Sequence, residues 1–123
     1  MPSFQDLDVW KKSHELTLDI YRLTSEFPKD EKYRLGDQLR RSASSIPANI
    51  AEGKGRSSQK EFLRFLDIAR GSVEETKYHL LLAKDLSYIP ENDYNKFAET
   101  YGTVGKMLNG LINKINKEIG TGS

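Results

Sequence analysis

Apolar residues recur every three or four positions along four segments of the chain, and this is the period of an amphipathic α-helix. The segments cover residues 7–27, 33–52, 57–86 and 91–118. The expected core positions are Val9, Ser13, Leu16, Ile20, Leu23 and Phe27; Leu35, Leu39, Ser42, Ile46 and Ile50; Phe62, Phe65, Leu66, Ala69, Val73, Thr76, Leu80 and Ala83; and Tyr94, Phe97, Tyr101, Val104, Leu108, Leu111 and Ile115. Short breaker clusters separate the segments, and alternating strand patterns are absent. The pattern therefore predicts an all-α fold, an antiparallel up-down-up-down four-helix bundle in a single domain over residues 1–123.

Polar residues and glycine mark the ends of the predicted helices. We expect Asp6 or Asp8 to cap the first helix, since a side-chain oxygen at this place accepts a free backbone N–H. Ser58 with Glu61 has the spacing of a capping box at the start of the third helix. Gly53 is expected as the C-cap of the second helix.

Pro47 lies inside the second predicted helix. Proline lacks an N–H and clashes with the carbonyl four residues earlier, here that of Ala43, so a kink or brief break is expected. We expect the freed carbonyls to be satisfied by nearby serines, namely Ser42, Ser44 and Ser45. Asn49 and Glu52 are expected to bond backbone groups freed at Pro47, or arginines of a neighbouring subunit.

The composition excludes several kinds of chemistry. The 123 residues contain no cysteine, which removes disulfides, thiolate metal sites and cysteine nucleophiles. The two histidines, His14 and His79, lack the Glu-x-x-His spacing that di-metal bundles use. A Gly-x-Ser-x-Gly nucleophile motif is absent as well. We therefore expect no enzymatic activity, no metal, no cofactor and no small-molecule substrate.

The hydropathy pattern argues against a membrane protein. The longest apolar runs, such as residues 80–83, fall far short of the roughly 20 residues that span a bilayer. The first residues show neither the basic segment nor the apolar segment of a signal peptide. We expect a cytoplasmic protein.

Positive charge is concentrated in the middle of the chain. Residues 32–60 contain seven basic and two acidic residues, while the whole chain has a formal net charge of only +1. The loop that follows Gly53 leads into the start of the third helix, where backbone N–H groups and the helix dipole favour an anion. The candidate nucleic-acid contacts are Arg40, Arg41, Lys54, Arg56, Lys60 and Arg64. The alternative is that these charges pair with the acidic first helix of a neighbouring subunit.

The third predicted helix is apolar beyond its core stripe. At about 100° per residue, Leu63 and Leu81 point to one side of the stripe, and Ile68 and Leu86 to the other. We interpret these side chains as a subunit interface, and the alternative is a set of ordinary surface leucines.

Three stretches of the sequence resemble a known family. They are DVWKKSH at residues 8–14, LRRSASSIPANIAEG at residues 39–53 and FLRFLDIARGS at residues 62–72. Over residues 4–119 the chain resembles the four-helix-bundle proteins encoded in intervening sequences of bacterial 23S ribosomal RNA genes. The resemblance implies a homopentamer with a central channel, and kinship with the basic, nucleic-acid-binding accessory proteins of diversity-generating retroelements. It implies no enzymatic activity.

Two hypotheses follow for the function. The first is a non-enzymatic homo-oligomer, pentameric if it follows the resemblance, that binds structured RNA or another nucleic acid through its local basic surface. The alternative is a protein-interaction scaffold whose charges form contacts between subunits.

Overall fold

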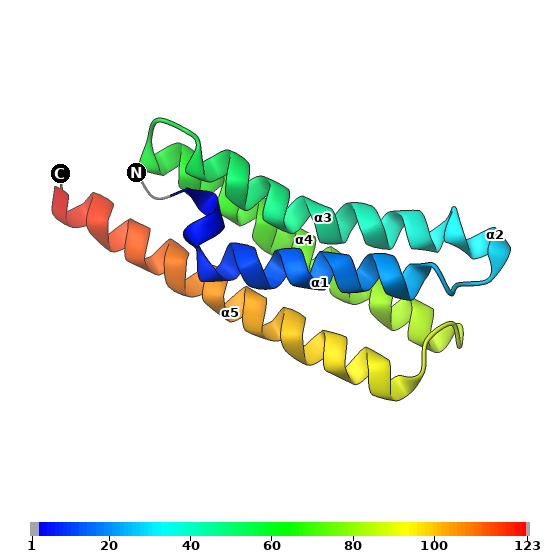
Figure 1. The fold of residues 1–123 in the computed structure, drawn as a ribbon. Coiled ribbons are helices and arrows are strands. Elements are labelled where there is room, and N and C mark those ends of the chain that lie inside the picture. Colours follow the sequence, from blue (N-terminus) through cyan, green and yellow to red (C-terminus); the bar gives the residue numbers. More distant parts are fainter. Residues whose placement is uncertain (1–2, 123) are drawn as a thin grey trace.

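Four long helices make up most of the computed structural model, which describes residues 3–122 (Figure 1). They are α1 (Asp8–Thr24), α3 (Leu35–Lys54), α4 (Gln59–Asp85) and α5 (Glu91–Gly122). A 3-10 turn, η1 (Phe4–Asp6), precedes α1, and the four-residue helix α2 (Lys29–Lys32) precedes α3. Residues 3–122 include no strand, so the predicted all-α fold with four principal helices is confirmed.

Neighbouring helices run in opposite directions along the bundle. In Figure 1 the chain runs outward along α1, back along α3, outward along α4 and back along α5. The contacts agree, since Thr17 and Thr24 of α1 bond Ala43 and Arg40 of α3, in reverse order. Helix α3 packs against both α1 and α4, whereas α5 packs chiefly against α4 and more sparsely against α1.

The predicted apolar stripes form the core. Of the 26 positions expected in the core, most are buried, and four lie half-buried at its edge. Those four are Leu23, Tyr94, Phe97 and Leu111. Burial of these stripes is what holds the glycine-containing α5 in a helix, because each glycine inside a helix costs up to about 1 kcal/mol relative to alanine.

The first helix is shorter than predicted at its C-terminal end, and its cap differs. It ends at Thr24 instead of residue 27, and α2 forms in what was expected to be a loop. The prediction of Asp6 or Asp8 as the N-cap is wrong, because the N-cap is Leu7, which makes no side-chain capping bond. Asp6 instead accepts the N–H of Ser3 at 3.0 Å and caps η1.

Helix α3 continues through Pro47, which is buried inside it. The expected break is absent, and a kink stays a prediction. The carbonyl of Ala43, which has no N–H partner at Pro47, lies 3.2 Å from the hydroxyl of Thr17, which also donates to the Ser13 carbonyl of its own helix at 2.8 Å. The serines that were expected to satisfy it bond elsewhere, as Ser42 donates to the Leu39 carbonyl and Ser44 to that of Arg41. The carbonyl freed at Pro47 is therefore met by a hydroxyl of α1 that it shares with Ser13.

Candidate nucleic-acid interface

The six predicted cations lie in two separate places. Arg40 and Arg41 lie in the first half of α3, whereas Lys54, Arg56, Lys60 and Arg64 surround the turn between α3 and α4. At 1.5 Å per residue, the 13 residues from Arg41 to Lys54 correspond to about 20 Å along the helix. We call the second group, residues 54, 56, 60 and 64, the turn cluster.

Arg40 is held inside the fold. Its guanidinium donates to the hydroxyl of Thr24 at 2.8 Å and to the carbonyl of Lys32 at 2.6 Å, and it pairs with the carboxylate of Asp37. Only 19% of the side chain is exposed. Arg40 therefore links the end of α1, the end of α2 and the start of α3, and three of its five donors are committed to these partners.

Two of the four cations of the turn cluster carry acidic partners. Arg56 pairs with Glu52 at 2.7 Å and Arg64 with Glu61 at 3.0 Å. The hydrogen bond from Arg64 lowers the pKa of the Glu61 carboxyl, which keeps that group ionised. Both guanidinium groups lie over the ring of Phe65, at 4.7 and 4.5 Å from its centroid.

The other two cations of the turn cluster, Lys54 and Lys60, form no ion pair within residues 3–122. Lys54 lies 5.8 Å from the centroid of the Phe62 ring, and Lys60 is exposed on the first turn of α4. Counting Glu52 and Glu61 against the four cations, the turn carries a local charge of +2.

A close approach of two helices shapes this turn. Gly53 is buried, and a Cβ at this position would lie 2.7 Å from the Cβ of Phe65 and 2.9 Å from Cδ1 of Phe62. Gly53 thus allows the last turn of α3 to touch the first turn of α4. The prediction of Gly53 as the C-cap is wrong, because α3 extends to Lys54 and the C-cap is Gly55.

Ser58 caps the start of α4, but the structure shows only this half of the predicted capping box, because the Glu61 carboxylate accepts from Arg64 and not from the Ser58 N–H. The hydroxyl of Ser58 accepts the N–H of Glu61 at 3.1 Å. This bond takes up one of the free N–H groups that were expected to bind an anion. The cationic side chains therefore carry the case for a phosphate contact at this end of the molecule.

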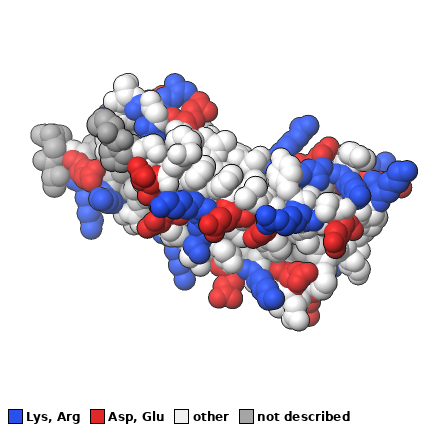
Figure 2. Space-filling view, viewed as in Figure 1, with Lys and Arg blue, Asp and Glu red and all other residues white. Residues whose placement is uncertain are grey.

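Figure 2 shows how the charges are distributed on one face. Blue and red atoms alternate along the length of the bundle, as a formal net charge of +1 requires. Blue atoms lie near the α3–α4 turn and around α2, with red atoms beside them, and further blue atoms lie between these two ends. The basic residues of the segment 32–60 themselves lie near the two ends of α3.

Asn49 bonds within α3, and Glu52 bonds to the turn that follows α3. The amide of Asn49 donates to the carbonyl of Ser45 at 2.8 Å and to its hydroxyl at 2.9 Å. Glu52 accepts from Arg56 of the same chain. Neither side chain bonds the carbonyl freed at Pro47, so that part of the prediction is wrong, and both support α3 locally.

The predicted interface residues on α4 differ in exposure. Leu63 is half-buried and packs against the core. Ile68 and Leu81 are 41% and 36% exposed, and Tyr78 and Leu86 are exposed as well. Apolar area thus remains on the outside of α4.

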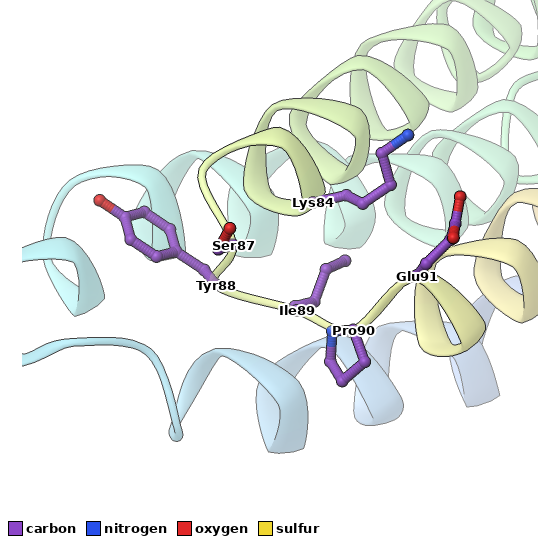
Figure 3. A pocket seen from close by; sticks show the side chains of 6 residues that line it. All are labelled: Lys84, Ser87, Tyr88, Ile89, Pro90 and Glu91. Atoms are coloured by element: carbon purple, nitrogen blue, oxygen red, sulfur yellow. The ribbon is translucent and has the colours of Figure 1, made fainter.

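The turn between α4 and α5 borders a surface hollow of about 600 Å³. Its polar lining consists of Lys84, Ser87 and Glu91, and Figure 3 shows Lys84 and Glu91 on one side with Tyr88 pointing away on the other. Ile89 is buried, and the ring of Tyr88 packs 5.7 Å from that of Phe27. These contacts close the turn.

The histidines are engaged with neighbouring side chains. His14 stacks on Trp10 with ring centroids 4.8 Å apart, and Nε2 of His79 lies 3.2 Å from Glu75. Across residues 3–122, His, Asp and Glu side chains do not gather in threes as a metal site would require. Among the described helices, none has the length and apolar character to cross a membrane.

The geometry defines an all-helical bundle with groups of basic residues near both ends of α3. Residues 5–110 match the family model of the 23S rRNA-intervening sequence proteins, and the chain belongs to this family. It is 30% identical to a protein of unknown function from the S23 ribosomal protein family of Bacteroides thetaiotaomicron, known from a crystal structure. The two superpose with a TM-score of 0.80 over 85% of this chain and 95% of the other. No curated protein matches the chain.

Proposed function

We propose that the protein is a non-enzymatic homo-oligomer of the bacterial cytoplasm that binds structured RNA through the turn cluster. The observation that carries this proposal is the gathering of Lys54, Arg56, Lys60 and Arg64 at one tight turn between two rigid helices. Cations fixed on helices are presented in a constant arrangement, which suits the regular phosphate spacing of a duplex.

The ion pairs in the turn cluster are compatible with RNA binding. The side chains of Glu52 and Glu61 are 54% and 42% exposed, and exposed pairs contribute little to stability. A phosphate can therefore replace either carboxylate at small cost, since arginine binds both groups in the same forked geometry. The single ring of Phe65 lies beneath both guanidiniums and helps to hold them in place for this exchange.

Assembly of several copies compensates for the modest charge of one chain. The family resemblance implies a pentamer, and apolar side chains on the outside of α4 offer a surface for association. An oligomer repeats the local charge of +2 on every subunit, and linked contacts on one RNA raise the overall affinity well above that of a single site.

A protein-interaction scaffold without RNA binding is the second candidate. It is favoured by the exposed apolar residues of α4, of which Tyr78 is 58%, Leu86 47% and Ile68 41% exposed. In this alternative the charged ends form contacts between subunits or with a protein partner.

The test is RNA binding measured by fluorescence anisotropy with a structured 23S ribosomal RNA hairpin, at about 50 to 200 mM salt. The Lys54→Gln, Lys60→Gln double variant should weaken binding and reduce the log–log salt slope by about 1.4–1.8. The control is Lys96→Gln with Lys106→Gln, which removes the same charge from exposed positions on α5. An equal loss in both variants would contradict a local site, and absence of binding at the lowest salt would favour the scaffold.

The mass of the assembled oligomer further distinguishes the RNA-binding protein from the scaffold. Native mass spectrometry of Arg41→Gln should give the wild-type oligomer if the basic residues serve RNA. Dissociation of that variant would place Arg41 between subunits and support the scaffold. Arg40 is unsuited to this test because its substitution breaks three bonds within the chain.

A further inference from the structure

The corner between α2 and α3 carries an exposed aromatic ring. Tyr33 ends α2 and is 74% exposed, more than the other large apolar residues that the structure leaves on the surface. Arg34 follows as the N-cap residue of α3 and is exposed too. A single exposed aromatic residue is ordinary, so its surroundings decide its meaning.

The surroundings of Tyr33 form a charged hollow. It has a volume of about 430 Å³, within the range of ligand pockets, and its lining is Tyr33, Arg34, Asp37, Gln38 and Arg41. It thus combines an aromatic face, two guanidinium groups, a side-chain amide and the carboxylate of Asp37. This hollow lies at the α2 end of the bundle, where Figure 2 shows blue atoms with red atoms beside them.

The arginines of this hollow are available to a ligand. Asp37 is one helical turn from Arg41, but its carboxylate is taken by Arg40. Within residues 3–122, no carboxylate forms an ion pair with Arg34 or Arg41. This differs from the turn cluster, where two of four cations are already paired.

Arg40 also fixes the corner in place. It bonds the carbonyl of Lys32, the residue before Tyr33, and so ties α2 to α3. Gly36 leaves room for this bond, since a Cβ there would lie 3.1 Å from Nη1 of Arg40 and 3.2 Å from the carbonyl of Glu31. Arg40 is thus a positioning residue, and the ring of Tyr33 is presented by a constrained backbone.

We propose that this corner binds an unpaired nucleotide of single-stranded nucleic acid. The base stacks on the ring of Tyr33, the adjacent phosphates bind Arg34 and Arg41, and the amide of Gln38 can meet a base edge. Stacking on an exposed aromatic residue flanked by cations is how proteins bind single strands with little sequence preference. The site is separate from the turn cluster, roughly 30 Å away along the 20 residues of α3.

The experiment uses the full chain and an eight-residue oligouridine. Tyr33→Trp should show fluorescence quenching on titration, because a stacked base quenches indole emission, while wild type reports only Trp10. Tyr33→Ala should weaken binding by about 5- to 150-fold, the loss expected for one stacked base. Tyr33→Phe keeps the ring and should bind as wild type does. Arg41→Gln should lower the salt slope by about 0.7.

Each other result overturns the proposal. Unchanged affinity in Tyr33→Ala, or no quenching in Tyr33→Trp, excludes stacking at this residue. An oligomer of lower mass in Tyr33→Ala shows that the corner is a contact between copies or with protein. The Lys54→Gln, Lys60→Gln variant separates the two sites, because it should keep oligouridine binding even if the structured hairpin does not bind to the turn cluster.

Discussion

The contact at Gly53 predicts that adding one methyl group will destabilise the fold. In Gly53→Ala the new Cβ would lie 2.7 Å from Cβ of Phe65 and 2.9 Å from Cδ1 of Phe62. Ordinary carbon contacts are about 3.5–4.0 Å. Since the Cβ of Phe65 is attached rigidly to the backbone of α4, relief requires the two helices to separate by most of an ångström.

The expected magnitude follows from this displacement. Overpacking a well-packed site costs about 1–3 kcal/mol. Alanine also favours the helix over glycine by up to about 1 kcal/mol, though less at the last turn, where Gly53 lies. Gly71→Ala is the matched control, because α4 leaves open space around that position and the same substitution should stabilise. The two variants should therefore differ by about 2–4 kcal/mol.

Thermal unfolding followed by circular dichroism measures this difference. At roughly 4 °C per kcal/mol, the midpoints of Gly53→Ala and Gly71→Ala should lie about 8–16 °C apart, with wild type between them. All three proteins are compared at one concentration, because association shifts the midpoint. A Gly53→Ala protein as stable as wild type would refute the close approach of α3 and α4.

Three further substitutions test other contacts. Ser87 has a φ of 65° in a Schellman turn that is closed by the bond from the Tyr88 N–H to the Ala83 carbonyl. Ser87→Gly removes roughly 1 kcal/mol of backbone strain and should therefore raise the unfolding midpoint by about 4 °C. Thr17→Val removes the hydroxyl that the carbonyls of Ser13 and Ala43 share, and should cost about 1–3 kcal/mol in urea unfolding. The part of this loss that comes from the Ala43 carbonyl should shrink in a Pro47→Ala background, where the N–H at position 47 is restored. The hydroxyl of Tyr101 is buried without a hydrogen-bond partner among the described residues, and burial, then the charge of Asp19, raises its pKa above the ordinary value of about 10. Above about pH 10 the hydroxyl of Tyr101 ionises in the unfolded chain but not in the folded chain, so the wild-type protein loses stability as the pH rises. The stability of Tyr101→Phe relative to wild type should therefore grow by about 1.4 kcal/mol per pH unit in this range.

The fold was predictable because each helix carries its burial pattern in its own residues. The stripe of α4 from Phe62 to Ala83 is fully buried as its period predicted. The ends of helices were less predictable, because they depend on contacts from elsewhere. Phe27 belongs to the apolar period of α1, yet it lies beyond the helix and is buried against Tyr88.

The role of Thr17 was hidden for the same reason. It lies on the apolar side of α1 and looks like a filler of the core stripe. Its function arises only when α1 lies beside the proline-containing turn of α3, 26 residues away. A buried proline inside a helix signals that some donor must meet the freed carbonyl, but the sequence alone does not say which one.

The candidate site shows why a count of charges along the chain does not define a binding surface. Arg40 and Arg41 are adjacent in sequence, but about 100° of helix rotation turns one toward Thr24 and the other to solvent. Asp37 pairs with Arg40 and not with Arg41, so the charge of Arg40 is neutralised while that of Arg41 stays available. The hollow at the α2 end is therefore lined by Arg41 together with Arg34, beside Tyr33, an uncharged residue that a count of charges does not register. The basic segment of the sequence thus resolves into two surfaces with different chemistry: a partly paired cluster suited to a duplex backbone, and an unpaired aromatic corner suited to a single base.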